Sequence, residues 1–192
     1  MFYTRSEIPF QRARNTVSGA IISKKSMMEK LGRTTHFEIQ SINERDNQQL
    51  RSSGVFQTPS KLVSDNLIHT FLKYSFPVFP IFNWTEFYAK YNNGATSPLL
   101  LNAIYMVATF HASESVLSDA GFSSRYIAGL TFYRKAKALY DSNHEFDGVT
   151  TVQATILMSN WWGGPMEQKD TWYWLGVSSS LAQSLGMHRS IG

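Results

Sequence analysis

Four of the five tryptophans of this 192-residue chain lie after residue 160, in the stretch that most constrains the fold. Residues 152–161 are apolar on nearly every side of a helix, which is typical of a central helix. Gly163-Gly164 follows, and Asp170 can cap a second helix. Its inner stripe is Trp174, Ser178, Leu181 and Leu185. The stretch predicts two buried helices joined by a tight glycine turn.

Capping residues mark the expected starts of the remaining helices. The starts are Thr58-Pro59, Asn83 with Glu86, Ser97-Pro98, Ser123 or Ser124, and Thr150 with Gln153. The stops are Pro77, Asn92-Asn93-Gly94, Gly121 and Gly186, and the helix from Pro98 is expected to run toward Glu114. Six helices with short connections and no convincing strand predict an all-α, irregular multi-helix domain.

The composition is that of a folded chain. Hydrophobic residues make up 43% and charged residues 17%, and the chain contains no cysteine. The absence of cysteine excludes disulfides, cysteine nucleophiles and thiolate metal clusters within this chain. No apolar run approaches the ~20 residues that a membrane-spanning helix needs, and residues 1–11 lack the apolar core of a secretory signal. We therefore expect no membrane partner.

The net charge of +4 lies entirely in residues 1–57, because the basic and acidic residues of 58–192 balance. Residues 1–57 show no sustained helical spacing, although Ser23 to Leu31 could form a short helix ending at Gly32. A basic arm can contact nucleic acid or a membrane surface, but the scattered charges favour a solvated tail. We expect residues 1–57 to be a loosely structured basic lead-in or linker, and residues 58–192 to form the folded domain.

Side chains that could carry chemistry do not combine into a recognisable site. The histidines are His36, His69, His111, His144 and His188, and none has the spacing of a metal site on one helix. The acidic residues near turns, Asp119, Asp141, Glu145 and Asp147, lack the spacing of a calcium loop and favour capping roles. We expect no catalytic, cofactor-binding or metal-binding residues, and no enzyme.

The aromatic residues of the C-terminal stretch allow a second interpretation. Trp161, Trp162, Trp172, Tyr173 and Trp174 could line a pocket between helices, although aromatic residues at helical spacing more often form core. The alternative function is therefore a helical ligand-binding or scaffold module without DNA contact.

A series of segments from Pro59 to Arg189 resembles the middle regulatory region of fungal zinc-cluster transcription factors. The segments are 76–81, 97–101, 121–125, 132–141, Gly163-Gly164-Pro165, 169–176 and 181–189, the last ending in Leu185-Gly186-Met187-His188-Arg189. Within this family the chain is most similar to the cutinase transcription factor 1 beta type. Because the segments occur in the family's order, the resemblance is fairly specific.

The resemblance implies a regulator of transcription in the nucleus. In that family a cluster of six cysteines holds zinc and reads DNA, whereas the helical middle region regulates activity. This chain has no cysteine, so zinc and DNA binding are implied by the family alone, and we expect no cofactor in this chain.

The family's helical region also continues beyond the segment that ends at Arg189. We therefore expect a fragment truncated at its C-terminal side, with an apolar patch exposed on the last two helices. Trp161, Trp172, Trp174 and Leu181 would belong to this patch. A protein partner or a second copy could bind there.

Overall fold

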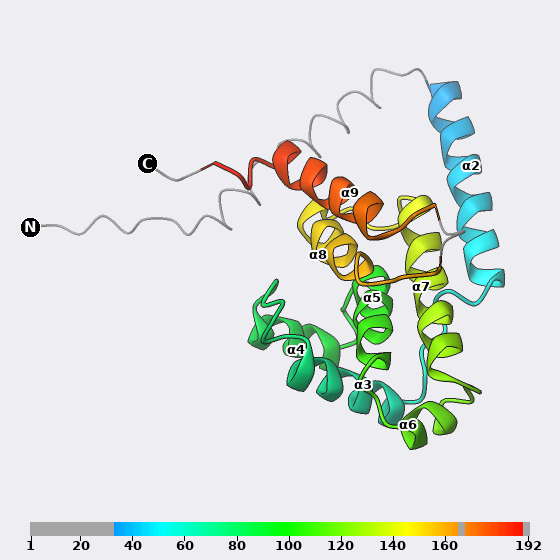
Figure 1. The fold of residues 1–192 in the computed structure, drawn as a ribbon. Helices are drawn as coiled ribbons and strands as arrows, with labels where there is room; N and C mark the ends of the chain where they lie inside the picture. Colours follow the sequence, from blue (N-terminus) through cyan, green and yellow to red (C-terminus); the bar gives the residue numbers. More distant parts are fainter. Residues whose placement is uncertain (1–32, 165–167, 190–192) are drawn as a thin grey trace, which may run out of the picture.

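The computed structural model describes residues 33–164 and 168–189, which form eight helices and no strand (Figure 1). The predicted all-α class is confirmed. The helices are α2 (Arg33–Ser52), α3 (Lys61–Tyr74), α4 (Trp84–Asn92), α5 (Pro98–Thr109), α6 (Glu114–Asp119), α7 (Arg125–Asp141), α8 (Gly148–Met158) and α9 (Thr171–Ser184).

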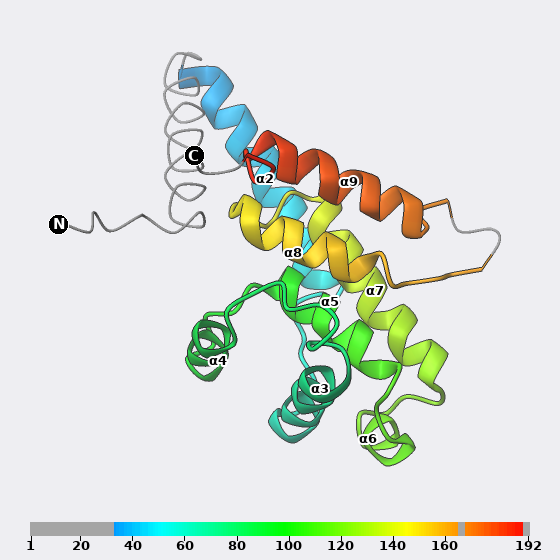
Figure 2. The ribbon, with the colours of Figure 1, turned by 60° about the vertical axis from the view of Figure 1, so that its left-hand side comes forward.

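Helix α5 is the centre of the molecule, and every residue from Leu99 to Thr109 is buried. Helices α7 and α8 pack against it, α3 covers another side, and α9 packs on α8. In Figures 1 and 2, α9 runs along the side of α8 that faces away from α3 and α4. The core is therefore built from the middle of the chain outward, and α9 is an outer layer.

Several helices begin at the predicted capping residues. The side chains of Ser97, Ser124 and Asp170 accept hydrogen bonds from backbone N–H groups in the first turns of α5, α7 and α9. The Asn83 side chain accepts one from the N–H of Glu86 at the start of α4. Such caps use donors that the helix itself leaves unpaired, so local sequence is enough to predict them.

Three predicted boundaries are wrong. Helix α3 is capped by Ser60, not Thr58, so Pro59 precedes the cap. Helix α8 is capped by Asp147, whose carboxylate accepts hydrogen bonds from the N–H of Val149 and the hydroxyl of Thr150. Helix α5 ends at Thr109, and the residues expected to extend it form the separate helix α6.

Helix α2 is an element that the apolar pattern did not predict. It lies within residues 1–57, where no sustained helix was expected, and that expectation is wrong for Arg33–Ser52. Its apolar side chains are sparse, and Leu50 near its end is the one classed as buried among those the structure describes. The predicted short helix at 23–31 lies outside the described residues, and the division of the chain at residue 57 stays a prediction.

The connection between α8 and α9 spans residues 159–170, so the expected tight turn is wrong. Gly164 does adopt a positive φ of 96°, as a glycine turn requires. Trp161 lies beyond the end of α8, yet only 2% of it is exposed. The connection thus sends a large side chain back into the core.

An ion-pair cluster joins this connection to α7. Asp141 pairs with Lys137 at 2.7 Å and with Lys169 at 2.8 Å. Partial burial opposes ionisation of Asp141, but the hydrogen bonds from both lysines outweigh it and hold the pKa of its carboxyl below the usual value.

We expect this cluster to make stability depend on acidic pH. A lowered pKa contributes stability above the unfolded value of ~3.9, and the contribution is lost as pH falls through the folded value. Asp141→Asn should therefore lower the free energy of unfolding at pH 7 by about 1 kcal/mol or less. Urea unfolding of both proteins from pH 7 to pH 3 measures this difference. A gap that stays constant down to pH 3 would contradict the charge-based explanation.

Candidate functional site: the outer face of α9

Helix α9 has an inner face that is fixed to the core. Trp174 is fully buried, and its indole N–H donates a hydrogen bond of 3.2 Å to the Tyr133 hydroxyl. That hydroxyl donates in turn to the backbone carbonyl of Lys169 at 3.1 Å. Ser178, one turn further along, is also buried. These contacts fix the rotation of α9 about its axis, and therefore decide which residues face outward.

The outer face of α9 consists of Trp172, Leu175, Gly176, Ser179 and Gln183, all of them exposed. Trp172 is 81% exposed, and a side chain added at Gly176 would meet open space. These positions recur at the spacing of one helical stripe, opposite Trp174 and Ser178. No residue of α9 is charged.

An exposed helix is normally covered with charged side chains, which favour solvation. A charge-free outer face with a prominent tryptophan is instead typical of a protein contact surface, where tryptophan contributes strongly to binding. The small residues beside Trp172 would let a partner helix approach closely. The geometry therefore favours binding to protein rather than chemistry.

The structure corrects part of the predicted exposed patch. Trp172 is exposed as expected, but Trp161 and Trp174 are buried and Leu181 is half-buried. Trp161 stacks on Tyr133 with ring centroids 5.3 Å apart, and so belongs to the core. The predicted patch is smaller than expected because α7 and α8 already cover the face of α9 that carries Trp174.

The five C-terminal aromatic residues do not form one pocket. Trp162 and Trp172 are exposed at 69% and 81%, whereas Trp161 and Trp174 are core residues. None of the five lines either of the two cavities described below. The signal for this division is visible in the sequence, because residues two apart on a helix, such as Trp172 and Trp174, must face different sides.

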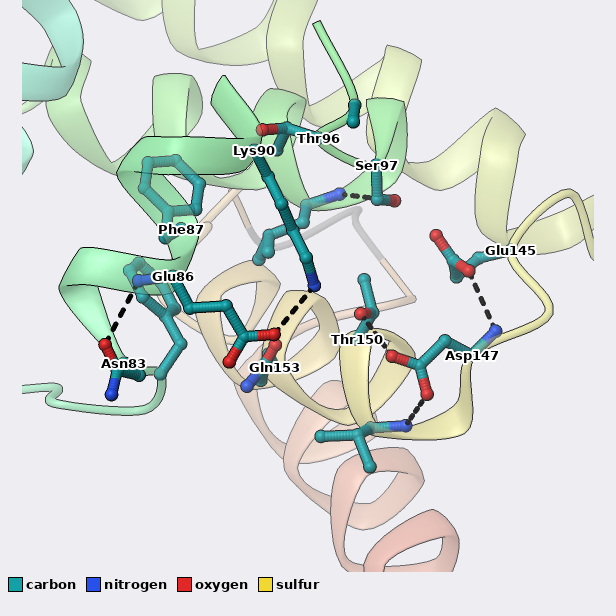
Figure 3. Close-up of a pocket in the computed structure, with 14 residues that line it drawn as sticks. Asn83, Glu86, Phe87, Lys90, Thr96, Ser97, Glu145, Asp147, Thr150 and Gln153 are labelled. Carbon is teal, nitrogen blue, oxygen red and sulfur yellow. Dashed lines mark hydrogen bonds and ion pairs between the residues drawn. The ribbon is translucent and has the colours of Figure 1, made fainter. Parts of the chain in front are cut away.

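A cavity of about 280 Å³ lies between α4 and the start of α8 (Figure 3). Figure 3 shows Lys90 reaching to Glu86 on one wall, at 3.0 Å, and Asp147 with its hydrogen-bond partners on the other. Glu145 accepts a hydrogen bond from the N–H of Asp147. The charged groups here are engaged in a surface ion pair and in capping α8, so their arrangement indicates structural roles.

The histidines are dispersed. His69, His111 and His188 are exposed, His144 packs edge-on against Phe56, and His36 lies in α2. No group of three or more potential metal-ligating side chains occurs in the described ranges. The zinc cluster of the resembling family needs thiolates, and this chain has no cysteine, so its residues do not fit that cluster.

Crossing a membrane requires a helix of about 20 predominantly apolar residues. Across residues 33–164 and 168–189, no helix is both long and apolar enough to cross a bilayer.

Residues 68–192 match the family model described as the fungal specific transcription factor domain. The chain belongs to this family. The match includes all of α4 to α9, and therefore both the buried centre and the outer face of α9. The resemblance seen in the sequence is confirmed.

Among curated proteins, the chain is 39% identical over 145 residues to cutinase transcription factor 1 alpha of Fusarium vanettenii, covering 74% of this chain and 16% of that protein. It is 33% identical over 156 residues to cutinase transcription factor 1 beta of the same organism, covering 79% and 18%. The fusaric acid cluster transcription factor FUB12 of Gibberella moniliformis is 26% identical over 149 residues, covering 78% and 22%. The chain thus spans less than a quarter of the length of these relatives. No solved structure matches it significantly.

Proposed function

We propose that this fungal-specific transcription factor domain regulates transcription in the nucleus and has no enzymatic activity. The observation that carries the proposal is the family match over residues 68–192, together with relatives that are named transcription factors. The charged groups of the cavity in Figure 3 are engaged in an ion pair within α4 and in capping α8, which supports a role without catalysis.

We propose further that the domain acts through protein contact at the outer face of α9. The occupant that fits is a helix with an uncharged face, since a charged partner would lose solvation without gaining an ion pair. The absence of charge from Thr171–Ser184 and the 81% exposure of Trp172 support this assignment. A second copy of the chain would meet the same requirement, and measurement of the molecular mass in solution separates it from a different protein.

The zinc and DNA binding of the family are expected to come from outside these 192 residues. Holding a zinc cluster requires cysteine, which this chain lacks. The alternative function is a ligand-binding or scaffold module without DNA contact. It predicts that the whole gene encodes no six-cysteine cluster. Coding sequence that includes a six-cysteine cluster next to this region favours the first function.

A tethering experiment tests the proposed function. The chain is fused to an unrelated DNA-binding domain in a fungal cell with a reporter gene. We expect reporter transcription to differ from that obtained with the DNA-binding domain alone, at matched protein levels. An unchanged reporter, with the fusion present in the nucleus, would contradict the proposed regulatory role.

A further inference from the structure

Helix α5 places most of its polar side chains on one face, although the whole helix is buried from Leu99 onward. Asn102 is 3% exposed and Tyr105 is 1% exposed. With Pro98 and Leu101 they recur at helical spacing and line a single cavity. Polar groups in a core destabilise a fold unless they are hydrogen-bonded. Asn102 meets this requirement, because its amide donates to the Pro98 carbonyl at 2.8 Å. The Tyr105 hydroxyl is therefore the group that calls for a physical reason.

The cavity lies between α3, α4 and α5 and has a volume of about 360 Å³. Phe56, Pro59 and Leu101 form its apolar walls, and the buried Ser64 contributes a hydroxyl from α3. Cavities that bind small molecules usually have ~300–1,000 Å³, mostly apolar walls and a few convergent polar groups. The cavity agrees with that description in both size and lining.

Two hydroxyls of this lining make no hydrogen bond of good geometry, namely Oη of Tyr105 and Oγ1 of Thr96. The Ser64 and Tyr91 hydroxyls lie close enough to Tyr105 to form weak hydrogen bonds with it. Burial, the largest effect, raises the pKa of Tyr105 well above its usual range. Hydrogen bonding with Ser64 lowers this pKa, and hydrogen bonding with Tyr91 raises it. The Tyr105 hydroxyl is therefore protonated at neutral pH and available as a donor. A buried donor whose hydrogen bonds are weak is costly, and a well-placed bound acceptor removes the cost.

The charged residues at the rim of the cavity, Lys61 and Asp65, neutralise each other. Lys61 pairs with Asp65, and its ammonium lies 4.4 Å from the centre of the Tyr91 ring. The Tyr91 hydroxyl donates to Asp65 at 2.7 Å. Lys61 is the one charged side chain among the described lining residues, and Asp65 neutralises it. The site therefore offers no unpaired charge to an ionic ligand.

We infer that this cavity binds an uncharged small molecule with an apolar body about the size of one ring and an oxygen acceptor, such as a carbonyl or ether. The acceptor oxygen takes the hydrogen bonds that Tyr105 and Thr96 leave unused, and the body lies against Phe56, Pro59 and Leu101. The site goes beyond the proposed regulatory function and does not depend on it.

Cyclohexanone is a suitable probe for the 192-residue chain, with amide chemical shifts in NMR spectra as the readout. We expect saturable shifts at Ser64, Thr96 and Tyr105, with a dissociation constant in the millimolar range. Tyr105→Phe keeps the shape of the ring and should weaken the binding about fivefold, the value of one hydrogen bond. Tyr88→Phe, at a half-exposed position outside the cavity, is the matched control and should leave the affinity unchanged.

Thermal unfolding distinguishes a ligand-binding hydroxyl from a structural one. Because the Tyr105 hydroxyl makes only weak hydrogen bonds to Ser64 and Tyr91, Tyr105→Phe should leave the melting temperature nearly unchanged. Thr96→Val is a second variant with the same expected loss of affinity. The proposal is overturned if cyclohexanone causes no saturable shift, if neither variant weakens it, or if cyclohexanecarboxylate binds as tightly as cyclohexanone.

Discussion

Replacing Trp174 with alanine is expected to lower the free energy of unfolding by about 3–5 kcal/mol, a large part of the ~5–15 kcal/mol of a typical domain. Trp174 is fully buried and makes edge-to-face contacts with Tyr133 and Tyr140. Its loss would leave a cavity between α7 and α9 and remove the indole N–H that donates to the Tyr133 hydroxyl, which would keep its own hydrogen bond to the Lys169 carbonyl. Urea unfolding followed by circular dichroism measures the change.

The matched control is Trp172→Ala, two residues earlier in the same helix. Trp172 is 81% exposed, so its removal should change the free energy of unfolding by no more than about 0.5 kcal/mol. Similar losses for the two variants would show that α9 has a different rotation about its axis, and the outer face would then be wrongly assigned.

Gly129→Ala is expected to destabilise the fold by about 1–3 kcal/mol, although alanine is the better helix former. A Cβ at Gly129 would lie 2.8 Å from Cζ3 of Trp161 and 3.1 Å from Oγ1 of Thr109. The Trp161 ring cannot retreat easily, because Tyr133 and Tyr126 pack beside it. The absence of a side chain on α7 is therefore what lets Trp161 enter the core.

Two comparisons isolate this clash in unfolding experiments. Gly176→Ala, on the open outer face of α9, should stabilise the fold by about 0.5–1 kcal/mol. In a Trp161→Leu background, Gly129→Ala should cost about 1 kcal/mol less than in the original chain. Additive effects of the two substitutions would mean that Trp161 does not occupy the space above Gly129.

Local chemistry explains which parts of this fold the sequence predicts. Ser97, Ser124 and Asp170 each cap a helix with their own side chain, so residues within one turn are sufficient. At the start of α8 the sequence offers two possible capping residues, Asp147 and Thr150, and the structure uses Asp147. The choice is linked to a distant contact, since Gln153 donates to the carbonyl of Ile81 rather than capping the helix.

Parts of the fold that depend on distant contacts could not be predicted. The burial of Trp161 depends on space above Gly129, and Trp161 lies outside any helical stripe. The polar face of α5 is hidden in an otherwise apolar run, and only its packing against α3, with Tyr91 of α4 alongside, gives Tyr105 and Thr96 a shared cavity. In contrast, the charge-free outer face of α9 follows from the sequence once Trp174 is known to face inward.

The C-terminal tryptophans thus divide between two roles. Trp161 and Trp174 complete the core, whereas Trp172 stands on a surface without charge, and no chemistry is assigned to either group. This division joins the fold to the proposed function, because a regulatory contact needs an accessible face on a rigidly held helix.

Reporter transcription with the tethered Trp172→Ala variant tests this account most directly. Leu62→Ala, which removes a 70% exposed side chain from α3, is the matched control. We predict that Trp172→Ala abolishes the effect of the tethered chain on the reporter at equal protein level, while Leu62→Ala retains it. An undiminished effect with Trp172→Ala would contradict the assignment of the outer face of α9 as the regulatory contact surface.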